Sequence, residues 1–197
     1  DANAAFQPVE IVSEEAISVR AEYGLNRPFV MYTGGIDHRK NIDGLIRAFA
    51  KLPEKLRKTY QLAIVCSAQP EKRQQLEHLA MTLGLGKEDL ILTGFVPEAH
   101  LLALYNLCAL FVFPSWHEGF GIPALEAMRC GAPVIGANTS SLPEVIGWED
   151  ALFDPRSDDE MAAVMERGLT DEEFRDALIK NGKVRSKQFS WDKSACR

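Results

Sequence analysis

Long apolar runs are missing from this sequence. No segment approaches the roughly 20 consecutive apolar residues that a membrane-spanning helix needs. The first eight residues also lack the basic segment followed by an apolar stretch that begins a secretory signal. We therefore expect a cytoplasmic protein rather than a membrane-spanning or exported one.

Cysteine, histidine and basic residues are also scarce. The four cysteines form no Cys-x-x-Cys pair and the four histidines stand at no zinc-binding spacing, so we expect reduced thiols and no structural metal. Lys and Arg number 22 against 28 Asp and Glu, which gives a net charge of −6. This balance disfavours nucleic acid as a partner, and it means that any anionic ligand must be held by local groups.

What the chain does contain is a regular alternation of short apolar runs with longer segments of helical period. The runs have the length and boundaries of buried parallel strands, and they are Phe29–Thr33, Gln61–Cys66, Leu90–Leu92, Ala109–Phe113, Pro133–Ile135 and Ala151–Phe153. Amphipathic segments separate several of them, at Asn41–Leu52, Glu71–Leu83 and Ala99–Leu107. Six strands alternating with helices predict an α/β fold with a doubly wound, Rossmann-like parallel sheet.

Outside this alternation the pattern predicts helices only. One is expected at Ser13–Tyr23. After the last strand, Asp158 is a candidate cap for a helix that ends near Leu169, and Asp171 for another that ends near Phe189. We therefore divide the chain into an N-terminal approach segment (1–27), a Rossmann-like domain (28–189) and a C-terminal segment (190–197).

The loop after the first strand has the composition of a phosphate site. In doubly wound sheets, ligands bind beyond the carboxyl ends of the strands. Here Gly34 and Gly35 allow close approach of the backbone to a ligand, and Arg39 and Lys40 supply cations that suit a diphosphate. The loop lacks the Walker and three-glycine dinucleotide patterns. Taken alone, it is equally compatible with a plain turn that carries a solvated basic pair.

The loop from Pro114 to Pro123 leads into a helix and carries two carboxylates nearby. Pro123 suits the first helical position, and the free N–H groups of a helix N-terminus attract phosphate. Glu118 precedes the helix and Glu126 is expected in its first turn. By chain reach the two lie on the order of 10 Å apart, the scale of a nucleoside diphosphate sugar. The structural alternative for Glu126 is a favourable charge at a helix N-terminus.

These loops resemble those of glycosyltransferase family 4, whose members have the two-domain GT-B fold. The resemblance rests on Pro-Ser-x-x-Glu-Gly-Phe-Gly-Ile-Pro-x-Leu-Glu-Ala-Met, which starts at Pro114, and on the upstream Gly-Gly-x-x-x-Arg-Lys-Asn. Gly94–Pro97 resembles the family's base-contacting loop, and residues 131–135 and 142–147 resemble its next strand and donor-side turn. Four motifs in the family's order cover about residues 28–153.

The resemblance implies roles for the residues that match. Lys40 corresponds to the lysine that holds the donor diphosphate, Glu118 to the glutamate that contacts the sugar, and Glu126 to the glutamate that binds the ribose hydroxyls. The other donor-binding residues implied are Gly34, Gly35, Val96, Pro97, Gly119, Phe120, Gly121 and Ile122. Many members carry Arg where this chain has Gly35, and Arg39 is our candidate for the second cation.

By this resemblance the chain is the C-terminal, donor-binding domain of a retaining hexosyltransferase. Such enzymes transfer a sugar from a nucleoside diphosphate sugar to an acceptor hydroxyl, in polysaccharide or glycolipid synthesis, and need no metal or other cofactor. Lys40 and Glu118 are the implied catalytic residues. Residues 190–197 would begin a crossover segment. A separate N-terminal domain would bind the saccharide or lipid-linked acceptor and give the enzyme a peripheral place at the inner face of the membrane, so this chain alone is expected to be inactive.

The sequences of these loops resemble those of bacterial polysaccharide enzymes. From this resemblance we expect GDP-mannose as the donor. UDP- and ADP-sugars stay open, because base choice depends on loop shape near Val96 and Pro97. Two other functions also stay open: a nucleotide-sugar epimerase of GT-B fold and a non-enzymatic nucleotide-sugar-binding module. Exchange of the sugar's C2 proton with solvent would identify the epimerase.

Overall fold

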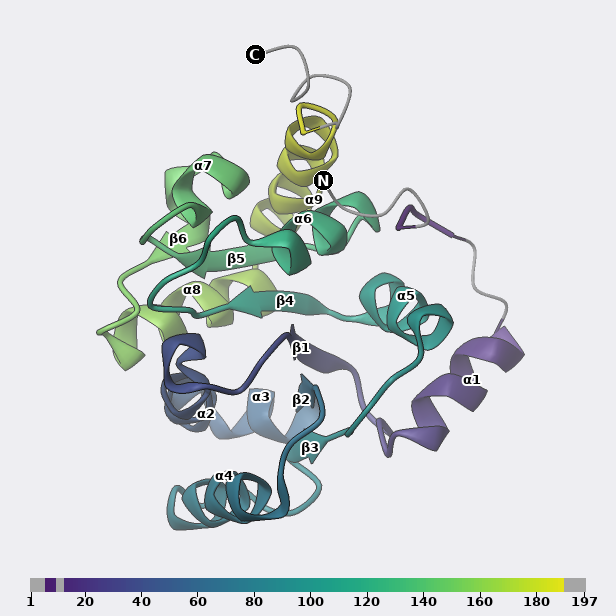
Figure 1. Cartoon of the computed structure of the whole chain (residues 1–197), viewed down its shortest axis with the longest axis vertical. Helices are drawn as coiled ribbons and strands as arrows, with labels where there is room; N and C mark the ends of the chain where they lie inside the picture. Colours follow the sequence, from purple (N-terminus) through teal and green to yellow (C-terminus); the bar gives the residue numbers. More distant parts are fainter. Residues whose placement is uncertain (1–5, 10–12, 190–197) are drawn as a thin grey trace.

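The central feature of the computed structural model, which describes residues 6–9 and 13–189, is a six-stranded sheet (Figure 1). Its strands are β1 (Phe29–Thr33), β2 (Gln61–Val65), β3 (Leu90–Leu92), β4 (Leu110–Phe113), β5 (Val134–Ala137) and β6 (Leu152–Phe153). Every pairing is parallel, and the spatial order is β3-β2-β1-β4-β5-β6. The predicted doubly wound sheet is confirmed, and its order reverses direction between β1 and β4. The expected crossover segment (190–197) lies outside the described residues.

Helices cover both faces of this sheet. They are α1 (Ser13–Glu22), α2 (Ile42–Lys51), α3 (Glu54–Thr59), α4 (Pro70–Thr82), α5 (Glu98–Leu107), α6 (Ile122–Arg129), α7 (Leu142–Ile146), α8 (Asp158–Thr170) and α9 (Glu172–Ser186), with short 3-10 turns η1 (His38–Lys40) and η2 (Glu149–Ala151). In Figure 1, α2, α4 and α8 lie to the left of the sheet, where α2 packs on both others, and α1 packs on α5 to the right. No helix among the described residues has the length and apolar character needed to cross a membrane.

The core forms because apolar side chains fill both faces of the strands. All five residues of β1 and of β2 are buried, as continuous apolar runs in parallel sheets require. On α2, the predicted stripe of Ile42, Leu45, Ile46 and Phe49 is fully buried against the sheet. Removing such side chains from water contributes about 1.5–3 kcal/mol each, so α2 is held firmly beneath the loop that precedes it.

Aromatic rings form the floor under the carboxyl ends of β1 and β4. Tyr32 stacks on Phe113 with ring centroids 5.8 Å apart, and Phe113 stacks on Phe111 at 6.0 Å. The Tyr32 hydroxyl donates a 2.6 Å hydrogen bond to the carbonyl of Gly35. The two loops of interest therefore rest on a packed and hydrogen-bonded base.

Several details differ from the sequence-based expectations. The predicted cap of α8 at Asp158 is wrong: the Ser157 hydroxyl accepts the hydrogen bond from the Glu160 N–H, and the Asp158 carboxylate binds Arg47 instead. Cys66, the last residue of the predicted second strand, lies just beyond the end of β2 and is half-buried. Helices α3 and α7 were not expected, because they are only 6 and 5 residues long.

Candidate functional site: the carboxyl edge at the strand-order reversal

The loops after β1 and β4 lie side by side at the carboxyl edge of the sheet. They flank the reversal of strand order, which is where open α/β sheets bind ligands. The backbone N–H of Trp116 donates a 2.7 Å hydrogen bond to the carbonyl of Arg39, which ties one loop to the other. The two loops predicted from sequence as phosphate-binding and sugar-binding therefore form one surface.

The centre of this surface is an ion pair between the two predicted catalytic residues. Lys40 Nζ lies 2.7 Å from Glu118 Oε1, although the residues are 78 positions apart in the chain. Their side chains are only 17% and 10% exposed, so water screens this pair less than it screens a surface pair. The structure thus places a cation and a carboxylate together at the edge where a ligand is expected.

Lys40 owes its position to the turn that precedes α2. Asp37 caps η1 by accepting a 3.1 Å hydrogen bond from the Arg39 N–H. Asn41 then takes a left-handed conformation (φ 54°), and its buried amide donates to the carbonyls of Pro114 (3.2 Å) and Pro155 (3.0 Å). The Asn41 side chain therefore fastens the turn that carries Lys40 to the loops after β4 and β6.

Glu118 is fastened by a residue that the sequence did not single out. The Ser140 hydroxyl accepts a 3.2 Å hydrogen bond from the Glu118 N–H and donates one of 2.7 Å to the Glu118 carbonyl. His117 Nδ1 lies 3.1 Å from the hydroxyl oxygen of Ser140. Ser140 has φ 58°, a left-handed conformation that a non-glycine residue adopts only at a cost. No local sequence signal reveals this contact, because it depends on the loop after β5 lying beside the loop after β4.

Glu126 has a different neighbour and a different environment. Its predicted place in the first helical turn is wrong: α6 begins at Ile122, so Glu126 falls in the second turn. The hydroxyl of the fully buried Tyr105 donates a 3.0 Å hydrogen bond to Glu126 Oε2. Burial raises the pKa of the Glu126 carboxyl, and the hydrogen bond from Tyr105 opposes this. No sequence motif singles out Tyr105, which has the spacing of an ordinary core residue of α5.

The glycine-rich approach to α6 ends one residue earlier than expected, because the helix begins at Ile122 and Pro123 is its second residue. Gly121 is the N-cap residue, with φ 87°, and no side chain caps the helix there. A side chain at Gly121 would also collide with Leu142, since its Cβ would lie 2.7 Å from Leu142 Cδ2. Phe120 and Ile122 are 38% and 43% exposed, and the Phe120 ring packs edge-on against Phe189 at 5.6 Å. The first N–H groups of α6 therefore face the edge of the sheet without a competing cap.

In the loop after β1, Gly34 packs closely on Tyr32, and Arg39 forms an ion pair with Asp37. Gly34 has φ 140°, and a Cβ there would lie 2.8 Å from the Tyr32 hydroxyl, so the position requires glycine. Arg39, the candidate second cation, is 67% exposed and pairs with Asp37 at 2.9 Å. The Arg39 side chain is thus held by the Asp37 carboxylate of the same loop. Its binding to a diphosphate stays a prediction.

A crevice of about 130 Å³ opens at the carboxyl ends of β1, β2 and β3. Its walls include Val96 and Gly94 of the predicted base-contacting loop together with Thr33. Pro97 lies next to it as the N-cap residue of α5. Phe95, beside the crevice, is 76% exposed. The predicted base loop therefore borders a hollow at the same edge of the sheet as Lys40.

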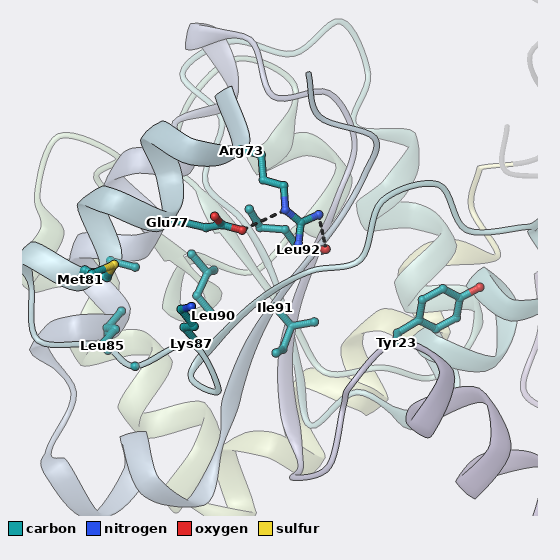
Figure 2. Close-up of a pocket in the computed structure, with 11 residues that line it drawn as sticks. Tyr23, Arg73, Glu77, Met81, Leu85, Lys87, Leu90, Ile91 and Leu92 are labelled. Carbon is teal, nitrogen blue, oxygen red and sulfur yellow. Dashed lines mark hydrogen bonds and ion pairs between the residues drawn. The ribbon is translucent and has the colours of Figure 1, made fainter. Parts of the chain in front are cut away.

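A hollow of about 390 Å³ at the β3 edge of the sheet contains none of these residues (Figure 2). It lies between α4 and β3 and is floored by apolar residues such as Leu90 and Leu92. Arg73 on its wall is bound by Glu77 at 2.9 Å and by the Leu92 carbonyl at 3.1 Å. Its arginine is thus engaged within the protein, and no residue of the loops that carry Lys40 and Glu118 lines this hollow.

Solved structures with the same fold define the class as the Rossmann-like half of a GT-B glycosyltransferase. One of them, sucrose-phosphate synthase from Thermosynechococcus elongatus, aligns with a TM-score of 0.79 and 30% identity, over 95% of this chain and 46% of that one. Residues 14–185 match the family described as "Glycosyl transferases group 1". The chain belongs to this family.

Two curated relatives are mannosyltransferases by name. The serotype-specific mannosyltransferase WbdA of Escherichia coli is 45% identical over 190 residues, which cover 96% of this chain and 23% of that protein. The O-antigen chain mannosyltransferase B of Escherichia coli is 35% identical, over 90% of this chain and 46% of that protein. The chain thus spans less than half the length of these relatives.

Proposed function

We propose that this chain is the donor-binding domain of a retaining hexosyltransferase that uses GDP-mannose. The observation that carries the proposal is the largely buried pair of Lys40 and Glu118 at the strand-order reversal, 2.7 Å apart. A diphosphate offers Lys40 a doubly charged partner, and a sugar offers Glu118 hydroxyl donors, so one nucleotide sugar can satisfy both groups. The names of the two Escherichia coli relatives support mannose as the sugar.

Each end of the donor has a complementary group at this edge. We assign the diphosphate to Lys40 and to the uncapped N-terminus of α6, because both favour negative charge. Glu118 accepts hydrogen bonds from the sugar, and Glu126 accepts them from the ribose. The base enters the crevice beside Val96, where the exposed ring of Phe95 offers a stacking surface.

Transfer then depends on stabilising the departing diphosphate. In the proposed reaction, the bond between the anomeric carbon and the diphosphate breaks and a bond to the acceptor oxygen forms on the same face. The acceptor proton passes to the departing phosphate oxygen. Lys40 and the α6 amides stabilise the charge that develops there, the role that a metal ion has in other transferases. The proposal therefore assigns no metal to the reaction.

This chain covers less than half the length of its named relatives, and we propose the remaining parts of the enzyme from that fact. A second domain, outside this chain, would bind a saccharide or lipid-linked acceptor, and it would place the enzyme at the inner face of the membrane. Residues 28–189 would form the donor domain. The family match and the named relatives favour transfer over epimerisation and over simple binding.

Calorimetric titration with GDP tests the proposal directly. Lys40→Ala removes the cation and leaves the Glu118 carboxylate unpaired beside the diphosphate. We expect about 10- to 100-fold weaker GDP binding, which corresponds to the roughly 1.5–3 kcal/mol of a charge-assisted contact. The loss should shrink at high salt, because salt screens the interaction.

Lys51→Ala is the matched control. Lys51 also forms a 2.6 Å ion pair, with Asp159, but it lies at the far end of α2 and is 45% exposed. GDP affinity should not change in this variant. Chelation of divalent metals should leave the affinity of the unmodified chain unchanged. Equal GDP affinity in the Lys40→Ala variant and the unmodified chain would place Lys40 outside the site.

A further inference from the structure

A second hollow lies beside the donor site and has a different chemistry. It has a volume of about 360 Å³ and lies between the turn before α2, the first half of α2, the start of α4 and the loop after β4. Its lining is Ile36, Asp37, His38, Asn41, Ile42, Asp43, Arg47, Lys72 and Trp116. Neither Lys40 nor Glu118 lines it, although its lining includes other residues of the two loops that carry them. It is therefore separate from the proposed donor site.

Trp116 forms the aromatic wall of this hollow. Its backbone is fixed by the 2.7 Å hydrogen bond to the Arg39 carbonyl, and its side chain is half-buried. Within the described part of the chain, the indole N–H has no hydrogen-bond partner and therefore stays available as a donor. A fixed indole with a free N–H combines an apolar face with a polar edge.

The charged groups of the walls are balanced. Asp43 pairs with Lys72 at 3.2 Å, and Arg47 pairs with Asp158 at 2.6 Å. The lining thus contains two carboxylates and two cations, each already in an ion pair. An anion gains little from such a wall, whereas the remaining lone pairs and N–H groups still bind hydroxyl groups well. The electrostatics therefore favour an uncharged, hydroxyl-rich ligand.

A hexose ring has the shape and polarity that this hollow fits. Its C–H groups form an apolar face that suits the indole, and its hydroxyl groups project toward the polar rim. The volume lies within the range of roughly 300–1,000 Å³ that is typical of small-molecule sites. Trp116 stands two residues before Glu118, so a sugar bound here lies close to the donor site.

We infer that the Trp116 hollow is a subsite for a neutral saccharide, which holds one unit of the acceptor chain beside the donor site. The inference rests on the proposed function, since a sugar acceptor belongs to a glycosyltransferase. It adds a binding site on the donor domain itself, and it names Trp116 as the residue that recognises the sugar ring.

Tryptophan fluorescence provides the test. The chain has three tryptophans, and the double variant Trp148→Phe/Trp191→Phe leaves Trp116 as the only one. Trp148 packs on Phe174 at 5.3 Å, and phenylalanine preserves an aromatic contact there. Titration with mannotetraose should give a saturable change with a millimolar dissociation constant. Inorganic phosphate should give none, because the wall is electrically balanced.

Further variants separate this subsite from the donor site. In calorimetry, Trp116→Ala should weaken mannotetraose binding at least tenfold and Trp116→Tyr should restore most of it, while circular dichroism checks that both variants fold. Lys40→Ala should weaken GDP binding and leave mannotetraose binding unchanged. If GDP binds but mannotetraose does not, or if Lys40→Ala abolishes the mannotetraose signal, the subsite is refuted. If GDP does not bind either, the proposed function fails as well.

Discussion

At the residue scale, Glu118 and Glu126 are carboxylates with unlike partners. Glu118 faces the cation of Lys40, whereas Glu126 accepts a hydrogen bond from the neutral hydroxyl of Tyr105. Burial raises the pKa of Tyr105 well above its ordinary value, so this hydroxyl remains a donor at any physiological pH. A partner that stays neutral cannot compensate the Glu126 charge, and the pKa of that carboxyl is accordingly raised by burial.

The two glutamates should respond differently to removal of their charge. Glu126→Gln should weaken GDP and GDP-mannose binding alike, by about 10- to 100-fold, because the ribose is common to both and charge-assisted hydrogen bonds contribute roughly 1.5–3 kcal/mol. Glu118→Gln should leave GDP binding unchanged or stronger, because it frees Lys40, and should reduce the preference for GDP-mannose. Calorimetry with GDP and with GDP-mannose measures both affinities for each variant. Identical behaviour of the two variants would show that the assigned roles are wrong.

Glu126 should also make the protein less stable at neutral pH. Because the folded pKa exceeds the pKa of a free carboxyl, the penalty is absent at acid pH and grows as the pH rises through the folded pKa. Glu126→Gln should therefore raise the melting temperature at pH 7 by a few degrees, given about 2–4 °C per kcal/mol for a chain of this size. Thermal unfolding at pH 4 and pH 7 measures this.

The comparison has an internal control in Glu54. Its carboxylate is exposed and pairs with Lys58 on α3, and the hydrogen bond from Lys58 lowers its pKa. Glu54→Gln should therefore show the opposite dependence, with any loss of stability confined to neutral pH. A Glu126→Gln variant that is no more stable than the unmodified chain at pH 7 would refute the claim that burial penalises this carboxylate.

At the element scale, the caps decide where the last helices begin. Ser157 caps α8 through its hydroxyl, and Asp171 caps α9 by accepting from the Phe174 N–H at 3.0 Å. The predicted cap at Asp171 is thus confirmed. The predicted cap at Asp158 is wrong by one residue, because Ser157 caps α8. Asp158 is free to bind Arg47, which joins α8 to α2 and so supports the helix below Lys40.

Ser157→Ala should destabilise the protein by about 1 kcal/mol, within the range of roughly 0.5–2 kcal/mol for loss of a cap. The reason is that the Glu160 N–H loses its 3.1 Å hydrogen bond at the start of α8. Urea unfolding followed by circular dichroism measures the change. Ser67→Ala is the matched control, since Ser67 is an exposed loop residue. Equal effects of the two substitutions would refute the role of the cap.

At the scale of the whole molecule, the residues that we propose for donor binding lie on an open edge of a single sheet. Catalysis of transfer requires an acceptor oxygen to be held near the anomeric carbon, and such positioning accounts for roughly 7–11 kcal/mol of barrier lowering. The relatives named above are more than twice as long as the segment that this chain matches. We therefore expect acceptor positioning to require a further domain.

The chain by itself should bind a nucleotide sugar without transferring the sugar. Donor affinity should be modest, about micromolar to millimolar, because an open edge desolvates the ligand incompletely. Incubation with GDP-mannose and an oligosaccharide acceptor, with release of GDP followed over time, should show at most slow hydrolysis. Efficient transfer by this chain alone would refute the proposal that the acceptor site needs another domain.

The strands were predictable for a local reason, and the choice of the proposed site residues rests on equally local motifs. Apolar runs with sharp polar boundaries identify strands, and β1 and β3 have the predicted bounds. The remaining strands differ at their ends by one or two residues, because apolar neighbours such as Ala151 can equally join a turn. Helices α3 and α7 escaped prediction because one or two turns carry too little periodicity to be recognised.

The sequence by itself determined the class of fold, because strand and helix patterns are local, and it selected Lys40, Glu118 and Glu126 as the residues we propose for the site. Only the tertiary structure decided which side chains meet. Glu118 contacts Lys40, 78 residues away, and Ser140, 22 residues away. Such contacts depend on the order of the strands in the sheet, since that order decides which loops become neighbours, and no pattern within a single loop contains it.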